Sequence, residues 1–157
     1  MIYILIGQSA SGKTTYVLNK FTGEMKLNTE PIKHTIVKND CLIGDYKTDK
    51  DCKGTDTLPF DSLNKIIKFI RNNHTNFDNI VAEGDRINNK KFIKYMYNID
   101  EDCKVILFKT SMNKSIERRK QRNSNPNKKF IKATRTKSFN NYIFSKKLGI
   151  NTEVIET

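Results

Sequence analysis

Short apolar runs alternate with amphipathic stretches along the whole chain of 157 residues. Runs rich in aliphatic and β-branched residues predict strands, and apolar residues spaced three and four apart predict helices. The predicted strands are Ile2–Ile6, His34–Lys38, Asn79–Glu83, Val105–Phe108 and Thr152–Ile155, and the predicted helices are Lys13–Phe21, Asp61–Asn73, Asn88–Asn98, Asn113–Arg122 and Phe130–Leu148. This alternation favours an α/β fold in which about five parallel strands form one sheet, with helices on both faces.

Two stretches interrupt the alternation. Leu42–Leu58 is mostly polar and predicts a long loop, a length that is typical of functional or mobile segments. Pro126 breaks a helical pattern, so a basic helical lid over approximately residues 113–137 is expected to be divided there. We see no linker and no internal repeat, and residues 1–157 are therefore predicted to form one domain.

A glycine-rich loop lies between the first predicted strand and the first predicted helix. Gly7–Thr14 matches the pattern G-x-x-x-x-G-K-[ST], and both flanks fit the strand–loop–helix context of a P-loop NTPase. Such a loop directs backbone N–H groups and the positive end of a helix at phosphate oxygens. Lys13 is expected to reach the β- and γ-phosphates of ATP, and the Thr14 hydroxyl to ligate Mg²⁺. The predicted nucleotide-binding residues are Gly7, Ser9, Ala10, Ser11, Gly12, Lys13, Thr14 and Thr15.

Carboxylates follow the second and third predicted strands. Glu83 and Asp85 end the third, and ligands of open α/β sheets bind beyond the carboxyl ends of strands. Either carboxylate could hold a water bound to Mg²⁺ or accept a proton from an attacking hydroxyl, so both are predicted as catalytic and metal-binding residues. Asp40, just past the second strand, is placed at the same edge, as a catalytic or substrate-holding carboxylate or as a plain turn residue. Arg86 could pair with Asp85 or hold a substrate phosphate.

The positive charge of the chain is concentrated in its C-terminal third. The net charge is +12, and residues 104–148 contain 14 of the 29 Lys and Arg residues but only 1 of the 17 acidic ones. Arg118 and Arg122 stand four apart on one predicted helical face, a spacing that lets two guanidinium groups converge on a triphosphate. The basic residues predicted to bind the acceptor are Lys128, Lys129, Lys132 and Arg135. A basic segment of this kind is either a solvated face or a surface that grips phosphates.

The cysteines and the apolar runs bear on location. Cys41, Cys52 and Cys103 are odd in number and not closely paired, a pattern that fits neither a disulfide framework nor a zinc site. A reducing cytoplasm is therefore expected, which would be the host cytoplasm for a viral protein. No stretch approaches the roughly 18 apolar residues of a membrane span, so no membrane association is expected.

Three further stretches carry a resemblance to a known family. Gly54–Leu58, Glu83–Arg86 and the run from Arg122 to Lys137 resemble small phage-encoded P-loop nucleotide or DNA kinases. That group is similar to the nucleoside monophosphate kinases and includes kinases acting on 5-hydroxymethyluracil in phage DNA. The resemblance implies a P-loop kinase fold, ATP and Mg²⁺ as cofactors, and a substrate-binding role for Asp56.

Together these features predict an enzyme that transfers the γ-phosphoryl group of ATP to a hydroxyl. A nucleic-acid acceptor is favoured, because the charge confined to one segment exceeds what one nucleotide requires. Two alternatives remain open: a kinase of free deoxynucleoside monophosphates, and an NTP-dependent regulator or toxin without kinase turnover. The oligomeric state is not predicted.

Overall fold

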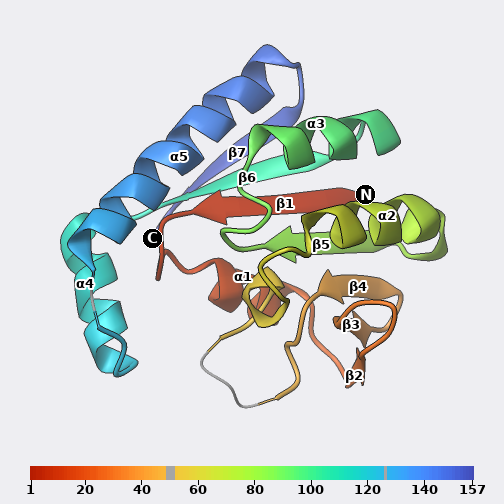
Figure 1. Cartoon of the computed structure of the whole chain (residues 1–157), viewed down its shortest axis with the longest axis horizontal. Coiled ribbons are helices and arrows are strands. Elements are labelled where there is room, and N and C mark those ends of the chain that lie inside the picture. Colours follow the sequence, from red (N-terminus) through yellow and green to blue (C-terminus); the bar gives the residue numbers. More distant parts are fainter. Residues whose placement is uncertain (49–51, 126) are drawn as a thin grey trace.

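Seven strands of the described residues form one mixed sheet in a computed structural model, which describes residues 1–48, 52–125 and 127–157 (Figure 1). The strands are β1 (Ile2–Gly7), β2 (Met25–Asn28), β3 (His34–Val37), β4 (Asp40–Ile43), β5 (Asn79–Glu83), β6 (Lys104–Lys109) and β7 (Asn151–Glu156). Their order is β2-β3-β4-β5-β1-β6-β7. The five strands from β4 to β7 in this order run parallel, whereas β2 and β3 are added at one edge by antiparallel pairing of β3 with β4 and of β2 with β3. The α/β class is confirmed, and the sheet has two more strands than predicted.

The second predicted strand and the loop after it need correction. β3 does not belong to the parallel set, because the chain turns back at once and pairs β3 with β4 as an antiparallel hairpin. Lys38 makes that turn with a positive φ of 54°. The fifth parallel strand is β4, which overlaps the start of the predicted loop Leu42–Leu58. That loop is further ordered by the short 3-10 helix η1 (Thr55–Thr57), and residues 49–51 lie outside the described ranges.

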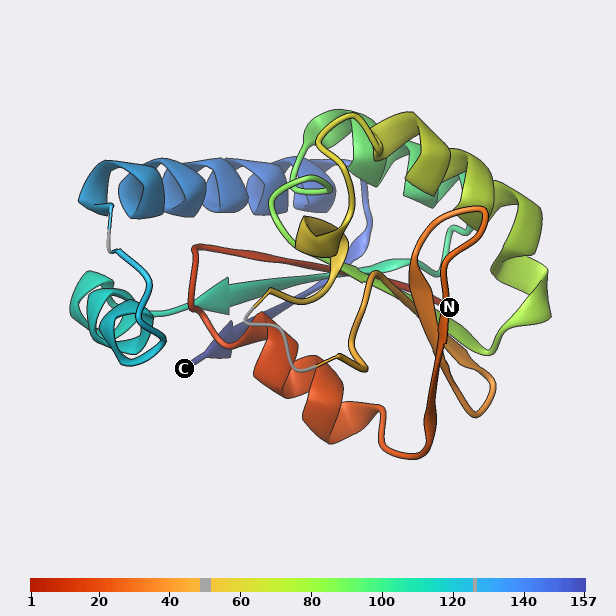
Figure 2. The same cartoon turned by 60° about the horizontal axis from the view of Figure 1, so that its bottom comes forward.

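The helices agree with the predicted ones to within a few residues. They are α1 (Lys13–Lys20), α2 (Leu63–Asn73), α3 (Lys90–Ile99), α4 (Met112–Gln121) and α5 (Lys128–Lys147), with the short 3-10 helix η2 (His74–Asn76) after α2. α2 and α3 lie with α5 on one face of the sheet, and α1 lies on the other (Figure 2). Each face buries its own apolar cluster: Ile66, Ile70 and Phe92 belong to the first, and Val17 and Phe21 to the second. The prediction of helices on both faces is confirmed.

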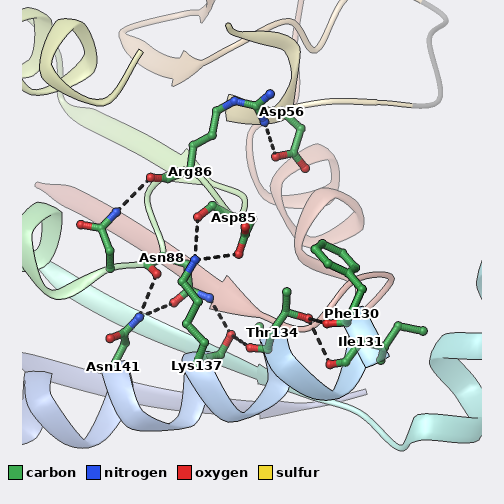
Figure 3. A network of polar contacts seen from close by, with 12 residues as sticks. Asp56, Asp85, Arg86, Asn88, Phe130, Ile131, Thr134, Lys137 and Asn141 are labelled. Carbon is green, nitrogen blue, oxygen red and sulfur yellow. Dashed lines mark hydrogen bonds and ion pairs between the residues drawn. The ribbon is translucent and has the colours of Figure 1, made fainter. Parts of the chain in front are cut away.

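Helix α5 is fastened to the body of the protein along its length. It contacts β1, β6 and β7, and its inward side buries polar residues as well as Ile131. The Asn88 amide donates a hydrogen bond to the Ser138 hydroxyl (2.8 Å), and Asn141 donates to the backbone and side-chain oxygens of Asn88 (2.9 and 2.8 Å; Figure 3). The part of the predicted lid that falls in α5, from Lys128 to residue 137, is therefore packed against the sheet, and the remainder of the predicted lid is α4 and the segment after it. Pro126, the predicted break, lies outside the described residues.

No helix of the described residues is long and apolar enough to cross a membrane.

Candidate functional site

The Gly7–Thr14 loop connects the end of β1 to the start of α1, at the edge where the parallel strands end (Figure 1). Gly12 adopts a left-handed conformation (φ 95°) immediately before the helix. The loop is joined to α4, because Gln8 is buried and its Nε2 donates a hydrogen bond to the Ser115 hydroxyl (2.6 Å). The positive end of α1 thus faces the space above the loop, an arrangement that favours an anion.

Lys13 is buried beneath this loop. Its Nζ donates to the backbone oxygens of Gly7 (3.1 Å) and Gln8 (3.0 Å) and to the Ser11 hydroxyl (3.2 Å). Burial lowers the pKa of the Lys13 ammonium, and nearby carboxylates, that of Glu83 first, oppose this shift. The lysine therefore holds the loop in shape while it brings a cation to the loop's inner surface.

Glu83 ends β5 directly opposite the loop and is 3% exposed. Burial raises the pKa of its carboxyl group, whereas the Lys13 ammonium and hydrogen bonds with Tyr46 and Thr14 act in the opposite direction. The Tyr46 hydroxyl donates to Oε1 of Glu83 at 2.8 Å. Burial and the adjacent carboxylate raise the pKa of Tyr46 well above its usual value, so this hydroxyl remains a donor at neutral pH.

The stretches Gly54–Thr57 and Glu83–Arg86, which carried much of the family resemblance, pack directly against each other. The Thr55 hydroxyl donates to the backbone oxygen of Glu83 (2.7 Å). A Cβ atom on Gly84 would lie 2.4 Å from the Thr55 hydroxyl, and one on Gly54 would lie 2.7 Å from Cγ of Glu83. Both glycines also have a positive φ, 125° and 64°. Only glycine allows this close approach, which places Asp56 beside Glu83.

A pocket of about 450 Å³ lies over the glycine-rich loop and collects most of the predicted site. It is lined by Ser9, Ala10, Ser11, Gly12, Lys13, Thr14, Cys52, Lys53, Asp56, Glu83, Arg119, Arg122, Asn123 and Ser124. Six of the eight predicted nucleotide-binding residues are among them, and Gly7 lies at the base of the loop. Thr15 lines a second pocket of about 450 Å³ on the other side of the loop, with Ala10, Tyr16, Arg118 and Thr157. We call these the loop pocket and the side pocket.

The arginines of α4 are divided between the two pockets. Arg122 lines both. Arg118, predicted to join it at a triphosphate, lines only the side pocket, where it donates to the Ala10 backbone oxygen (3.2 Å) and the Thr157 hydroxyl (3.3 Å). Arg119 takes the place expected of Arg118 in the loop pocket and donates to the Ser9 hydroxyl. Among the described residues its Nε is buried without a hydrogen-bond partner.

Asp85 and Arg86 do not line the loop pocket, and each forms an ion pair with another residue (Figure 3). The Asp85 carboxylate pairs with Lys137 of α5 (3.0 Å), and Arg86 pairs with Asp56 (2.9 Å). Asp85 does not line the loop pocket, so the predicted metal set of Thr14, Glu83 and Asp85 is only partly brought together. Arg86 holds a carboxylate, but that of Asp56 rather than Asp85.

The placement of Asp40 at this edge was wrong. Asp40 begins β4 and pairs in register with Asn79 at the start of β5. It therefore lies at the amino ends of the parallel strands, whereas Glu83 lies at their carboxyl ends. Its carboxylate accepts a hydrogen bond from the Asn79 amide (2.8 Å). The error follows from the β3–β4 hairpin, which reverses the chain direction. The carboxylate beyond β4 is Asp45, which caps a turn by accepting from Lys47 N and Thr48 N (both 3.0 Å).

A third cavity of about 670 Å³ runs along α5, and we call it the lysine groove. It is lined by Lys90, Lys129, Lys132, Ala133, Thr136, Lys137, Asn140 and Asn141, and none of these residues is acidic. Two of the predicted acceptor-binding residues, Lys129 and Lys132, lie here. Lys128 and Arg135 are exposed on α5 but do not line the groove, since they fall on another side of the helix.

Sequence reasoning missed four contributors to these sites: Tyr46, Arg119, Lys90 and Lys137. The sequence does contain a signal for Lys90 and Lys137. Lys137 lies eight residues after Lys129, a spacing that fits one face of a helix, and Lys90 follows the loop at the end of the third predicted strand. Arg119 has a weaker one, since three arginines in five residues leave open which of them faces the loop. Tyr46 has none, because its contact with Glu83 spans 37 residues of sequence.

Tyr46→Phe provides a test of the Glu83 environment. The ring stays while the hydroxyl donor is removed, so the carboxylate is deprived of a stabilising hydrogen bond and its pKa should rise further. For any activity that needs ionised Glu83, the acid limb of the pH profile should then lie at a higher pH in the variant than in the wild type. The pH profile of kcat/KM for both proteins checks this, and an unmoved acid limb would show that Glu83 does not titrate in the reaction.

The loop pocket therefore combines a buried ammonium, two guanidinium groups, a helix amino terminus, a threonine hydroxyl and a buried carboxylate. Such a set can bind a polyanion, neutralise charge that develops on it, and accept a proton or orient a water beside it. Neither a protein-family model nor a curated protein matches the chain.

Proposed function

We propose that this protein is a P-loop phosphotransferase that binds ATP with Mg²⁺ and transfers the γ-phosphoryl group to a hydroxyl of a nucleic acid. The observation that carries the proposal is that Lys13 and Glu83 are both buried and line one pocket, which also contains a loop of the G-x-x-x-x-G-K-[ST] pattern. A triphosphate also fits the unsatisfied donor of this pocket, because a phosphate oxygen would accept a hydrogen bond from the buried Nε of Arg119.

The roles of the chain's own residues follow from their places. Lys13 and the amino end of α1 would hold the β- and γ-phosphates, while Arg119 and Arg122 would neutralise charge on the transferring group. The side pocket, on the other side of the loop, offers room for the nucleoside portion beside Tyr16 and Arg118. The phosphates thus lie in the loop pocket with the γ-phosphoryl group toward Glu83.

Mg²⁺ fits the oxygen donors of this pocket. No three Cys, His, Asp or Glu side chains of the described residues gather into a cluster that would hold a metal, and a magnesium ion bound with phosphates requires few protein ligands. The Thr14 hydroxyl would be its direct protein ligand, and Glu83 would hold one of its waters. When bound, the ion would neutralise charge on the phosphate oxygens.

In the reaction, the acceptor oxygen attacks the γ-phosphorus, the bond to the β-phosphate oxygen breaks, and ADP leaves. The hydroxyl proton must go to a base within hydrogen-bond reach. Glu83 is better placed for this than Asp85, because it lines the loop pocket and burial raises its pKa, which makes the carboxylate a stronger base. Asp85 is tied to Lys137 and is better placed to orient the acceptor side.

The lysine groove supports a nucleic-acid acceptor. Four lysines line one cavity that has no acidic lining residue, and one of them, Lys137, links the groove to Asp85 through the ion pair at 3.0 Å. A mononucleotide presents too few phosphates to engage the groove and the site at once, whereas a strand can span both. A free deoxynucleoside monophosphate remains the alternative acceptor, and release of phosphate without a labelled acceptor would favour an NTP-dependent regulator.

Paired substitutions on α5 test the acceptor. Lys129→Ala with Lys132→Ala removes two charges from the groove, and Lys128→Ala with Arg135→Ala removes two exposed charges of the same helix outside it. The groove variant should raise the acceptor KM and flatten its salt dependence by about 0.7 to 0.9 in log–log slope for each phosphate that it no longer binds. The control variant should change both much less, and the ATP Kd should stay constant in all proteins.

Equal acceptor KM values in the groove variant and the wild type would contradict the nucleic-acid assignment. The free-nucleotide kinase would then be the better account of the site.

A further inference from the structure

Phe60 is the most exposed large apolar side chain of the described residues, with 93% of its surface accessible. It follows η1 by three positions, in the segment that packs against the end of β5. Single exposed apolar side chains are common on protein surfaces, so the contacts and neighbours of this ring decide whether it has a role.

A guanidinium group lies over the Phe60 ring. The Cζ atom of Arg86 lies 4.6 Å from the centroid of the Phe60 ring, within the range of a cation–π contact. Arg86 is itself fixed at two points: it pairs with Asp56 (2.9 Å), and its Nε donates to the Pro59 backbone oxygen (3.3 Å). Arg86 and Phe60 therefore form a supported flat surface that is open to solvent.

This surface is joined by direct contacts to both parts of the proposed reaction site. Asp56, which holds Arg86, lines the loop pocket beside Glu83. Asp85, the neighbour of Arg86 in sequence, pairs with Lys137 of the lysine groove (Figure 3). Phe60 is thus connected to the loop pocket through Arg86 and Asp56, and Asp85, next to Arg86, contacts the lysine groove.

We propose that Phe60, backed by Arg86, is a stacking platform for an unpaired nucleobase of the acceptor. The inference rests on the proposed function, which gives the location of the acceptor. It adds that the acceptor base is unpaired, either in a single strand or extruded from a duplex. Stacking suits this surface because every base has a π-face, whereas a base inside a duplex has none available. The neighbouring lysines supply the phosphate contacts that such binding sites combine with aromatic rings.

The sequence contains no tryptophan, so Phe60→Trp creates a single fluorescent reporter at the platform. A single-stranded oligodeoxynucleotide should quench this fluorescence in a saturable way, because a base stacks on the indole. An abasic oligomer of equal length keeps the phosphates and should leave the fluorescence unchanged. Phe139→Trp, at a 54% exposed position of α5 outside the groove, is the matched control and should not be quenched by either strand.

Two further ligands show which kind of molecule supplies the stacked base. A fully paired duplex should quench much less than the single strand, and a free deoxynucleoside monophosphate should quench only if the platform serves a mononucleotide kinase. Phe60→Ala should raise the Kd for the single strand by about tenfold, the scale of one base–aromatic stack, and leave the ATP Kd unchanged.

Quenching does not require ATP or turnover, so it is independent of the kinase assignment. Equal quenching by the abasic and normal strands, or no quenching by a normal strand that binds in an anisotropy assay, would overturn the platform. A protein that binds no strand at all would overturn it too. Failure of label transfer with intact base-specific quenching would reject the proposed reaction and leave the platform standing.

Discussion

A folded Lys13→Ala variant should lose nearly all phosphoryl transfer, by roughly 10²- to 10³-fold, the scale of one preorganised charge contact at a reacting oxyanion. Lys13 is the buried cation of the loop, and three hydrogen bonds aim its Nζ at the loop's inner surface. No other residue of Gly7–Thr14 carries a positive charge that could replace it. The measurement is kcat and KM for ATP in the variant, with circular dichroism to verify the fold.

Lys20→Ala is the matched control for this prediction. Lys20 lies at the other end of α1, where its Nζ contacts Tyr16 and the ring of Tyr3 rather than the loop. Its substitution removes an equal charge from the same helix and should leave transfer close to the wild-type rate. A folded Lys13→Ala protein with near-normal turnover would remove the basis for the P-loop assignment.

Glu83→Gln should lower kcat by roughly 10²-fold or more while ATP binding is kept, because the amide cannot accept the acceptor's proton. The substitution is nearly isosteric, and its amide oxygen can still accept the hydrogen bond of Tyr46. If Glu83 instead holds a water of the metal ion, the variant should require more Mg²⁺ and recover rate as Mg²⁺ rises. Titrating Mg²⁺ at saturating ATP therefore assigns the role.

Asp85→Asn provides the comparison for Glu83. Asp85 lies outside the loop pocket and pairs with Lys137, so its substitution should act mainly on the acceptor KM and much less on kcat. Wild-type kinetics for both variants would show that the strand-end carboxylates are structural. A larger kcat decrease for Asp85→Asn than for Glu83→Gln would exchange their proposed roles.

The helices and strands that have a clear local pattern of apolar residues were predicted well. β5 matches its predicted bounds of Asn79–Glu83, and each of the five predicted helices is present with an end shift of at most two residues. These segments have strong periodicity and clear stop signals such as Gly149, which has a positive φ of 82° just past α5. β2 and β4 were missed: β2, Met-Lys-Leu-Asn, has only two apolar residues, and β4 begins with Asp40 and runs into the polar stretch that predicted a loop.

The site was predictable only where a motif carries its own geometry. Lys13 and Thr14 were placed through the loop pattern, which fixes strand, loop and helix together. Asp40 was misplaced because strand direction depends on a hairpin that involves long-range pairing. Arg118 and Arg119 are adjacent in sequence but face different pockets, and helix rotation of that size is set by packing against the loop rather than by spacing.

The central claim is transfer of the γ-phosphoryl group of ATP to a hydroxyl of a nucleic acid. The most direct measurement incubates the protein with γ-labelled ATP and a panel of single-stranded DNA, duplex DNA, hydroxymethylated DNA, RNA and free deoxynucleoside monophosphates, with Lys13→Ala as the blank. The proposal predicts label covalently bound to a polynucleotide with the wild type and none with Lys13→Ala. Label found only in free nucleotides, or only in inorganic phosphate, would contradict it.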